Sequence, residues 1–283
     1  METAEEEEVA GTEAQQLGVR EACKHILTRG DLRSKLTSVA ADGATLLDSD
    51  VTGDAFPSRP ARDPGLEMAS GAATLPRPGA LHSPHARALC LARFAHHELQ
   101  AVELFAWAFL RWPELPREMA TGLLRILGDE QRHARAYLDR LDAQGFDFAS
   151  FAPHSDYLWK NADVIGTPAA FLAAVGLTFE QANLDFSLLY RDAFREAGDE
   201  ESARVCQEIH DDEVGHVAFA ASWLEVLEPE GDAVARYEAS VPFPFSAARA
   251  KGRRFDVAAR RRAGLSDAFI EHVRAARSSQ ERG

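Results

Sequence analysis

Four long segments of helical periodicity constrain the fold of this chain more than any other feature. Ser83-Pro84 and Thr167-Pro168 each place a capping hydroxyl before a proline at the first helical position. A glycine or a proline follows the end of each segment, as is typical of helix C-termini. The pattern predicts helices over residues 83–110, 116–144, 167–198 and 199–227.

The connections between these helices predict how they are arranged. Tight turns join the first helix to the second and the third to the fourth, whereas about twenty residues (146–166) separate the second from the third. Two helix pairs joined by one long crossover are typical of a ferritin-like four-helix bundle rather than of an up-and-down bundle. We therefore predict an all-α fold in which residues 83–228 form the bundle.

The segments that flank the predicted bundle differ from it in composition. Residues 1–18 are acidic and poor in large apolar side chains, so we expect a disordered tail. Residues 19–82 combine a short helical pattern with clusters of Gly, Pro, Asp and Ser, which predicts an N-terminal arm laid over a larger body. Residues 229–283 are expected to form a basic, helical C-terminal extension that packs on the bundle.

Charge and cysteine content exclude several classes of protein. The 31 Lys and Arg residues against 45 Asp and Glu residues give a net charge of −14, which opposes nonspecific binding to nucleic acid or anionic lipid. Three widely spaced cysteines build neither a disulfide framework nor a four-cysteine metal site. Because the sequence shows neither a secretory signal nor an apolar stretch of about 20 residues, we expect a cytoplasmic protein without a membrane partner.

Each predicted helix carries one glutamate about 12 to 14 residues from its start, or roughly 20 Å along the axis at 1.5 Å per residue. In antiparallel helices of similar length, mid-height is the level that coincides, so these four carboxylates can converge. Glutamates that face solvent have no reason to lie at the same height on all four helices. The four residues are Glu98, Glu130, Glu180 and Glu213.

Two of the four glutamates are followed three residues later by histidine. Residues i and i+3 share a helix face, so the pairs Glu130/His133 and Glu213/His216 can each offer a carboxylate and an imidazole to one point. Glu98 precedes Glu130 by 32 residues, and Glu180 precedes Glu213 by 33. Each half of the bundle thus supplies a lone glutamate and then a Glu-x-x-His motif.

This set of side chains is suited to two divalent metal ions. Four carboxylates and two neutral imidazoles carry a charge of about −4, which two divalent cations neutralise. We predict that Glu98, Glu130 and His133 hold one iron ion, that Glu180, Glu213 and His216 hold the other, and that carboxylates bridge them. Manganese is the alternative metal, and zinc is less favoured because its usual helical motif places two histidines four residues apart.

Three further residues are candidates for a supporting role. Asp129 and Asp212 each precede a predicted glutamate ligand, and metal-bound imidazoles usually donate their second N–H to a carboxylate or carbonyl. Tyr137 lies one turn beyond His133 on the same face and could act near the metals. The simpler interpretations are solvated helix acids for the aspartates and a core aromatic for the tyrosine.

Several motifs resemble a bacterial ferritin-like family that is catalogued as a domain of unknown function. The resemblance covers about residues 55–270 and implies a di-iron carboxylate site similar to those of bacterioferritins, rubrerythrins and the bacterial tRNA hydroxylase. The motifs are HHELQAVEL, DEQRHARAYLDRL, PHSDYLW, TFEQANLD and DDEVGHVAFAASWLE.

The leading functional hypothesis is a di-iron oxidoreductase that activates O2 to hydroxylate or oxidise a substrate. The substrate would be a small molecule or, given the ten Lys and Arg against four acidic residues from Ser246 onward, borne on RNA. The sequence carries no nucleotide-binding signature, so electrons would come from an external donor. The alternatives are an iron-handling protein that oxidises Fe(II) as its own substrate, and a non-catalytic metal-binding or interaction bundle. A homo-oligomer is compatible with the sequence.

Overall fold

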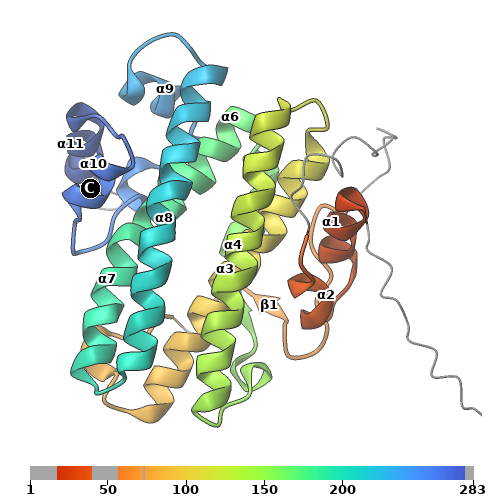
Figure 1. Cartoon of the computed structure of the whole chain (residues 1–283), viewed down its shortest axis with the longest axis vertical. Helices are drawn as coiled ribbons and strands as arrows, with labels where there is room; N and C mark the ends of the chain where they lie inside the picture. Colours follow the sequence, from red (N-terminus) through yellow and green to blue (C-terminus); the bar gives the residue numbers. More distant parts are fainter. Residues whose placement is uncertain (1–17, 40–56, 73, 278–283) are drawn as a thin grey trace, which may run out of the picture.

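The computed structural model describes residues 18–39, 57–72 and 74–277, and Figure 1 shows how its helices are arranged. The described chain is mostly helical, which confirms the predicted all-α class. The acidic tail predicted over residues 1–18 lies outside the described residues except for Gly18. Among the helices of the described part, none is both long and apolar enough to cross a membrane.

Four long helical rods form the bundle. The first two, α3 and α4, pack against each other, as do α7 and α8, and α4 also contacts α8. The rods start one residue after the positions that the capping pattern predicts. The first, second and fourth rods are α3 (Pro84–Arg111), α4 (Arg117–Ala143) and α8 (Glu200–Leu227). The third rod consists of α6 (Pro168–Phe171), a π-helix (Leu172–Glu180) and α7 (Gln181–Glu196).

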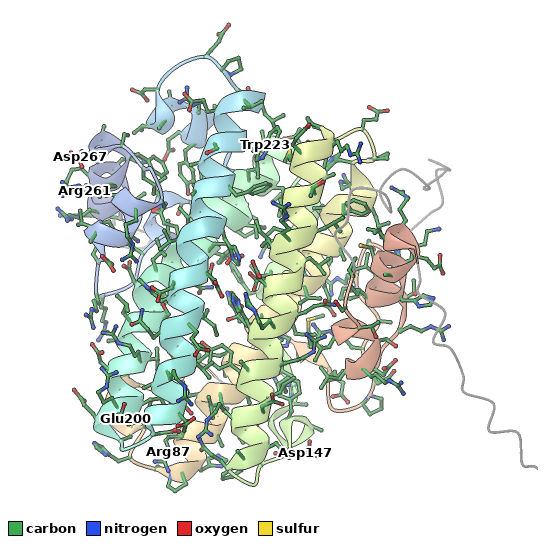
Figure 2. The ribbon with its side chains drawn as sticks, in the orientation of Figure 1. Arg87, Asp147, Glu200, Trp223, Arg261 and Asp267 are labelled. Carbon is green, nitrogen blue, oxygen red and sulfur yellow. The ribbon has the colours of Figure 1, made fainter. Side chains whose placement is uncertain are left out.

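The direction of each rod follows from the labelled side chains of Figure 2. Arg87 near the start of α3, Asp147 just after α4 and Glu200 at the start of α8 lie at one end of the bundle, and Trp223 of α8 lies toward the other. The crossover therefore carries the chain from this end to the opposite end, where α6 begins (Figure 1). Because of this crossover, α4 and the third rod run in the same direction.

The two predicted capping hydroxyls behave differently. The Thr167 side chain accepts a hydrogen bond of 3.1 Å from the Ala170 amide, as the pattern predicts. Ser83 occupies the N-cap of α3, but its side chain makes no capping hydrogen bond, so that part of the prediction is wrong. Ser83 is exposed, and water can therefore satisfy the free amides at this helix start.

The third rod departs from the regular helix that the sequence predicts. Nine residues, Leu172–Glu180, form a π-helix that ends at a predicted metal ligand. Thr178 donates its hydroxyl hydrogen bond to the Ala173 carbonyl (2.8 Å), five residues earlier. A Cβ at Gly176 would lie 2.3 Å from the Cβ of Ala220, so glycine is needed for α8 to approach this segment. Such π segments are frequent at functional sites.

The N-terminal arm and the crossover are tied to α3 by one buried carboxylate. The arm contains α1 (Val19–Thr28) and α2 (Leu32–Leu36). Glu103 is fully buried, forms an ion pair with Lys35 Nζ at 2.7 Å, and accepts hydrogen bonds from Arg62 at 2.6 Å and from Trp159 Nε1 at 3.0 Å. Lys35 and Arg62 belong to the arm and Trp159 to the crossover, so a single side chain fastens both segments to the bundle.

Short elements complete the connection between the arm and the crossover. Strand β1 (Met68–Ala69) of the arm pairs in parallel with β2 (His154–Ser155) of the crossover. The crossover also contains α5 (Tyr157–Lys160) and the 3-10 turns η2 (Phe148–Phe151) and η3 (Ala162–Val164), and the turn η1 (Pro78–Ala80) precedes α3.

The C-terminal extension is anchored on α7 by a buried ion pair. The fully buried Arg260 donates to both carboxylate oxygens of Asp185, at 2.8 and 2.9 Å. Asp185 also accepts from the backbone amides of Gly252 and Asp256. The extension comprises α9 (Ala233–Ser240), the 3-10 turn η5 (Ala247–Arg249), α10 (Val257–Arg262) and α11 (Asp267–Ala275).

Replacing Arg260 by leucine should destabilise the protein by about 3–5 kcal/mol, because it leaves the Asp185 carboxylate buried without its counter-charge. Urea unfolding at pH 7 measures the loss. The matched control is Arg261→Leu, whose ion pair with Asp267 lies on the surface (Figure 2) and should cost less than about 1 kcal/mol. Equal losses for the two variants would contradict this assignment.

Candidate metal centre

The structure brings the six predicted ligands together in the middle of the bundle. Each side chain is at most 4% exposed. The lone glutamates come from α3 and from the last residue of the π-helix, and the two Glu-x-x-His motifs come from α4 and α8. We refer to these residues as the carboxylate–histidine cluster: Glu98, Glu130, His133, Glu180, Glu213 and His216.

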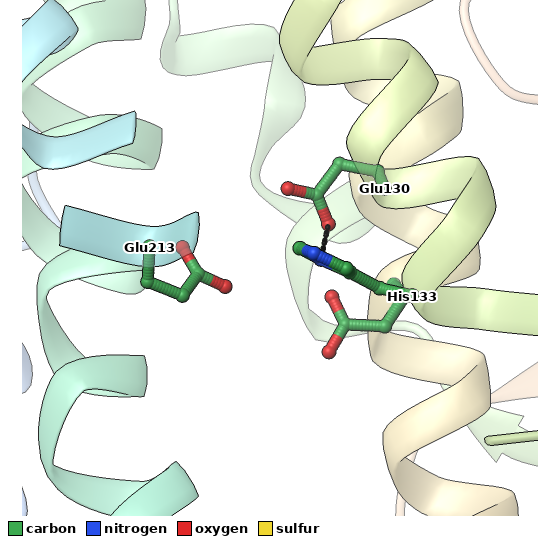
Figure 3. Close-up of side chains that lie close together, drawn as sticks. Glu130, His133 and Glu213 are labelled. Carbon is green, nitrogen blue, oxygen red and sulfur yellow. Dashed lines mark ion pairs between the residues drawn. The ribbon is translucent and has the colours of Figure 1, made fainter. Parts of the chain in front are cut away.

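Within the cluster, the side chains form two groups that share two members. In each group one potential ligand atom per residue lies within 4.8 Å of the others. Figure 3 shows Glu130 and His133 on α4 facing Glu213 on α8. One group is Glu98, Glu130, His133 and Glu213, and the other is Glu130, Glu180, Glu213 and His216. Glu130 and Glu213 therefore belong to both groups.

Several buried polar atoms of the cluster lack a hydrogen-bond partner within the described chain. They include Oε2 of Glu98, Oε2 of Glu180 and Nδ1 of His133. Buried polar atoms in folded proteins are almost always paired. Since all three atoms belong to metal-ligating groups and lie in the cluster, a bound cation would satisfy them, and the residues present fit a metal centre.

Burial and neighbouring charge favour the protonated form of the two lone glutamates. Burial raises the pKa of Glu98 well above its usual value, and the charges of Glu130 and Glu213 raise it further. Burial and the same two carboxylates also raise the pKa of Glu180 well above its usual value. Metal binding would therefore have to displace protons from both lone glutamates.

The two imidazoles supply the positive charge that the cluster otherwise lacks. Burial lowers the pKa of His133, but the hydrogen bond to Asp212 and the nearby Glu130 carboxylate outweigh that effect and raise the pKa to about 9. Burial also lowers the pKa of His216. Hydrogen bonds to Asp129, Glu130 and Glu213 outweigh this effect and raise the pKa of His216 well above its usual range. Burial would raise the pKa of Glu130, yet its bonds to the two histidines hold it below its usual value.

The two predicted supporting aspartates contact the imidazoles in a crossed arrangement. His133 of α4 places Nε2 3.1 Å from Asp212 of α8, and His216 of α8 places Nε2 3.3 Å from Asp129 of α4. Arg132 lies between the aspartates, 2.7 Å from Asp129 and 3.1 Å from Asp212. Each aspartate thus orients the histidine of the opposite helix and leaves its Nδ1 for the cluster.

Other polar side chains near the cluster have different partners. Tyr137 donates its hydroxyl hydrogen bond to Sγ of Cys206 at 3.8 Å, so this bond goes to a thiol rather than to a predicted metal ligand. Asn183, one turn after Glu180, donates to Oε1 of Glu213 at 3.0 Å. Its position on the ligand face of its helix was the only sequence signal for this contact.

The adjacent histidines of α3 diverge. His96 directs Nε2 to the Ser155 carbonyl at 2.9 Å and stacks on His154 at 4.5 Å between ring centroids. Burial lowers the pKa of His97, while the charges of Glu130 and Glu213 oppose that shift. His97 is therefore the histidine nearer the cluster. Helix geometry predicts that only one of the two can face the site, and the tertiary structure decides which.

Residues 20–271 match the family described as Protein of unknown function (DUF455). The chain belongs to this family. No curated protein and no solved structure matches it. The DUF455 match therefore supports the resemblance to a domain of unknown function, and any activity must be argued from the cluster itself.

Replacing Asp212 by asparagine should weaken metal binding by about 10- to 100-fold, because His133 loses the carboxylate that orients it. Isothermal titration with Mn(II) at pH 7 measures the affinity. The neighbouring Asp211→Asn is the matched control, since Asp211 is exposed and contacts His210 rather than the cluster. An unchanged Mn(II) affinity in Asp212→Asn would contradict the crossed arrangement.

Metal affinity of this DUF455 protein should rise with pH up to about 9. His133 has a pKa of about 9 without metal and is protonated at pH 7, whereas a ligating imidazole must be neutral. Protons therefore compete more strongly as the pH falls, and affinity should drop by about tenfold per pH unit for each proton displaced. Mn(II) titrations from pH 6 to 8 test this, and an affinity that does not vary would contradict it.

Proposed function

We propose that this DUF455 protein is a ferritin-like di-iron carboxylate oxidoreductase, which uses O2 to oxidise or hydroxylate a substrate. The observation that carries the proposal is the pair of overlapping, buried donor groups that share Glu130 and Glu213. Two groups with common carboxylates suit two metal ions held side by side. A single ion held by one group would leave two of the six side chains without a cation.

The chemistry of the donors favours iron or manganese. Four carboxylates with two imidazoles match the charge of two divalent ions, and carboxylate-rich sites with histidine suit these metals. A lone glutamate on each of two helices and Glu-x-x-His on the other two is the arrangement of di-iron and di-manganese proteins of the ferritin-like class. The single long crossover of this bundle supports the same class.

Each ligand would have a distinct task. Glu130 and Glu213 would bridge the ions, while Glu98 and Glu180 would each ligate one ion. His133 would coordinate through Nδ1, because its Nε2 donates to an aspartate, and His216 would do the same. Bound iron would supply the electrons for O2 reduction and the oxidising power for the substrate. The surrounding protein keeps the ligands oriented and away from bulk water.

Metal content and oxygen uptake test the proposal. Anaerobic loading should give about two Fe(II) per wild-type chain, and Glu130→Ala or Glu213→Ala should lose both ions, because each carboxylate belongs to both donor groups. Glu208→Ala is the matched control, since Glu208 is exposed on the same helix α8. Retention of two ions in either cluster variant would overturn the assignment.

The stoichiometry of oxygen uptake separates this function from iron handling. Uptake that stops after about two irons per chain, and resumes when a reductant is added, supports an oxidase. Continued oxidation of many Fe(II) ions per chain would overturn it in favour of a protein whose substrate is iron.

A further inference from the structure

A pocket with a volume of about 450 Å³ lies where three segments of the chain meet. These segments are the end of the N-terminal arm, α7 and the loop between η5 and α10, and none of the six cluster residues lines the pocket. Pockets that hold small organic molecules have volumes of roughly 300–1,000 Å³. The lining used in this argument comprises Arg77, Phe186, Leu189, Tyr190, Lys251 and Arg253.

The charged side chains of this pocket are all positive. Among the described residues, no Asp or Glu lines the pocket, and neither Arg77 nor Arg253 forms an ion pair with a carboxylate. Lys251 adds a third cation, whose Nζ donates to the carbonyls of Arg274 and Ala276. The whole chain carries a net charge of −14, so this pocket is a local reversal of the overall charge.

The arm side of the pocket is fixed to α7. Tyr190 donates its hydroxyl hydrogen bond to the Pro76 carbonyl at 2.6 Å. Arg77 follows directly and lies between Pro76 and Pro78, with an extended backbone at φ −65° and ψ 145°. A residue that precedes proline is restricted to such extended conformations. The backbone of Arg77 therefore has little freedom to lose when its side chain binds a ligand.

The opposite side of the pocket is fixed to α7 as well. The Gly252 amide donates to Oδ2 of Asp185 at 2.8 Å. A Cβ at Gly252 would lie 2.9 Å from the Cβ of Asp185, so glycine allows the loop to approach α7 this closely. Arg253 follows directly. Burial raises the pKa of Tyr190, and the positive charge of Arg253 opposes that rise. Both arginines thus directly follow a residue that is hydrogen-bonded to α7.

The α7 side of the pocket is apolar. Phe186, Leu189 and Tyr190 line it, and their spacing of three and four residues places them on one face of the helix. An inorganic anion held by the arginines alone would leave this apolar surface uncovered. The combination of cations and apolar side chains therefore favours a ligand with an anionic group and an apolar body.

We propose that this pocket binds a small phosphate monoester with an apolar body. The charge of a phosphate dianion matches the two guanidinium groups of Arg77 and Arg253, and guanidinium groups donate paired hydrogen bonds to phosphate oxygens. The apolar body packs on Phe186, Leu189 and the Tyr190 ring. Because the metal centre contributes no residue to the pocket, this proposal does not depend on the proposed oxidase.

Three probes test the two parts of the ligand. Calorimetric and NMR titrations of the full, metal-free chain at pH 8 compare phenyl phosphate with inorganic phosphate and with anisole. Phenyl phosphate should bind at least tenfold more tightly than inorganic phosphate, because its ring covers apolar surface, and at least tenfold more tightly than neutral anisole. Binding of phenyl phosphate that is no tighter than that of either comparison probe, or no binding at all, would overturn the proposal. Metal-free protein is used so that phosphate cannot bind to an ion in the cluster.

Variants locate the binding to this pocket. Arg77→Gln and Arg253→Gln should each weaken phenyl phosphate binding by about tenfold, because each removes charged hydrogen-bond donors. Arg125→Gln is the matched control, since Arg125 is an exposed arginine on α4 that does not line the pocket, and it should leave the affinity unchanged. Thermal unfolding checks that each variant is folded. An equal loss in the control, or unchanged affinity in both pocket variants, would overturn the site.

Discussion

Repulsion among four carboxylates buried at one level of the bundle is the constraint on which this structure depends. Neighbouring charges and burial push protons onto Glu98 and Glu180. Two imidazoles, raised in pKa by their own hydrogen bonds, offset the charge of the remaining pair. Asp212 of α8 pairs with His133 of α4, and Asp129 of α4 pairs with His216 of α8, so the charges of the imidazoles are balanced across the two helices. A divalent cation would have to displace the protons of the lone glutamates in order to bind.

The segments outside the four rods complete the surroundings of the cluster. Glu103 fastens both the N-terminal arm and the crossover to α3, through Lys35, Arg62 and Trp159. That attachment holds the crossover against α3. The C-terminal extension packs on α7 and is held there by the buried ion pair between Arg260 and Asp185. The long crossover is thus packed on the bundle as well as being the connection between the helix pairs.

Much of this architecture could be predicted because the signals are local. Capping residues and prolines placed the helix starts to within one residue, and the Glu-x-x-His spacing identified four members of the cluster. The height of Glu98 and Glu180 along their helices identified the other two. The π-helix escaped prediction, because its wider turn depends on hydrogen bonds and on contact between Gly176 and Ala220, and not on apolar periodicity. The Ser83 hydroxyl makes no capping bond, and its exposure leaves the first amides of α3 open to water.

The sequence by itself determined the helix boundaries, the lone glutamates and the two Glu-x-x-His motifs, since each depends on residues within a few turns of one another. Only the tertiary structure decided which carboxylates are shared, which aspartate orients which histidine, and that His97 rather than His96 approaches the cluster. Those outcomes depend on how α3, α4 and α8 are rotated about their axes when their apolar faces pack. Rotation is a property of the assembled core, and no single helix encodes it.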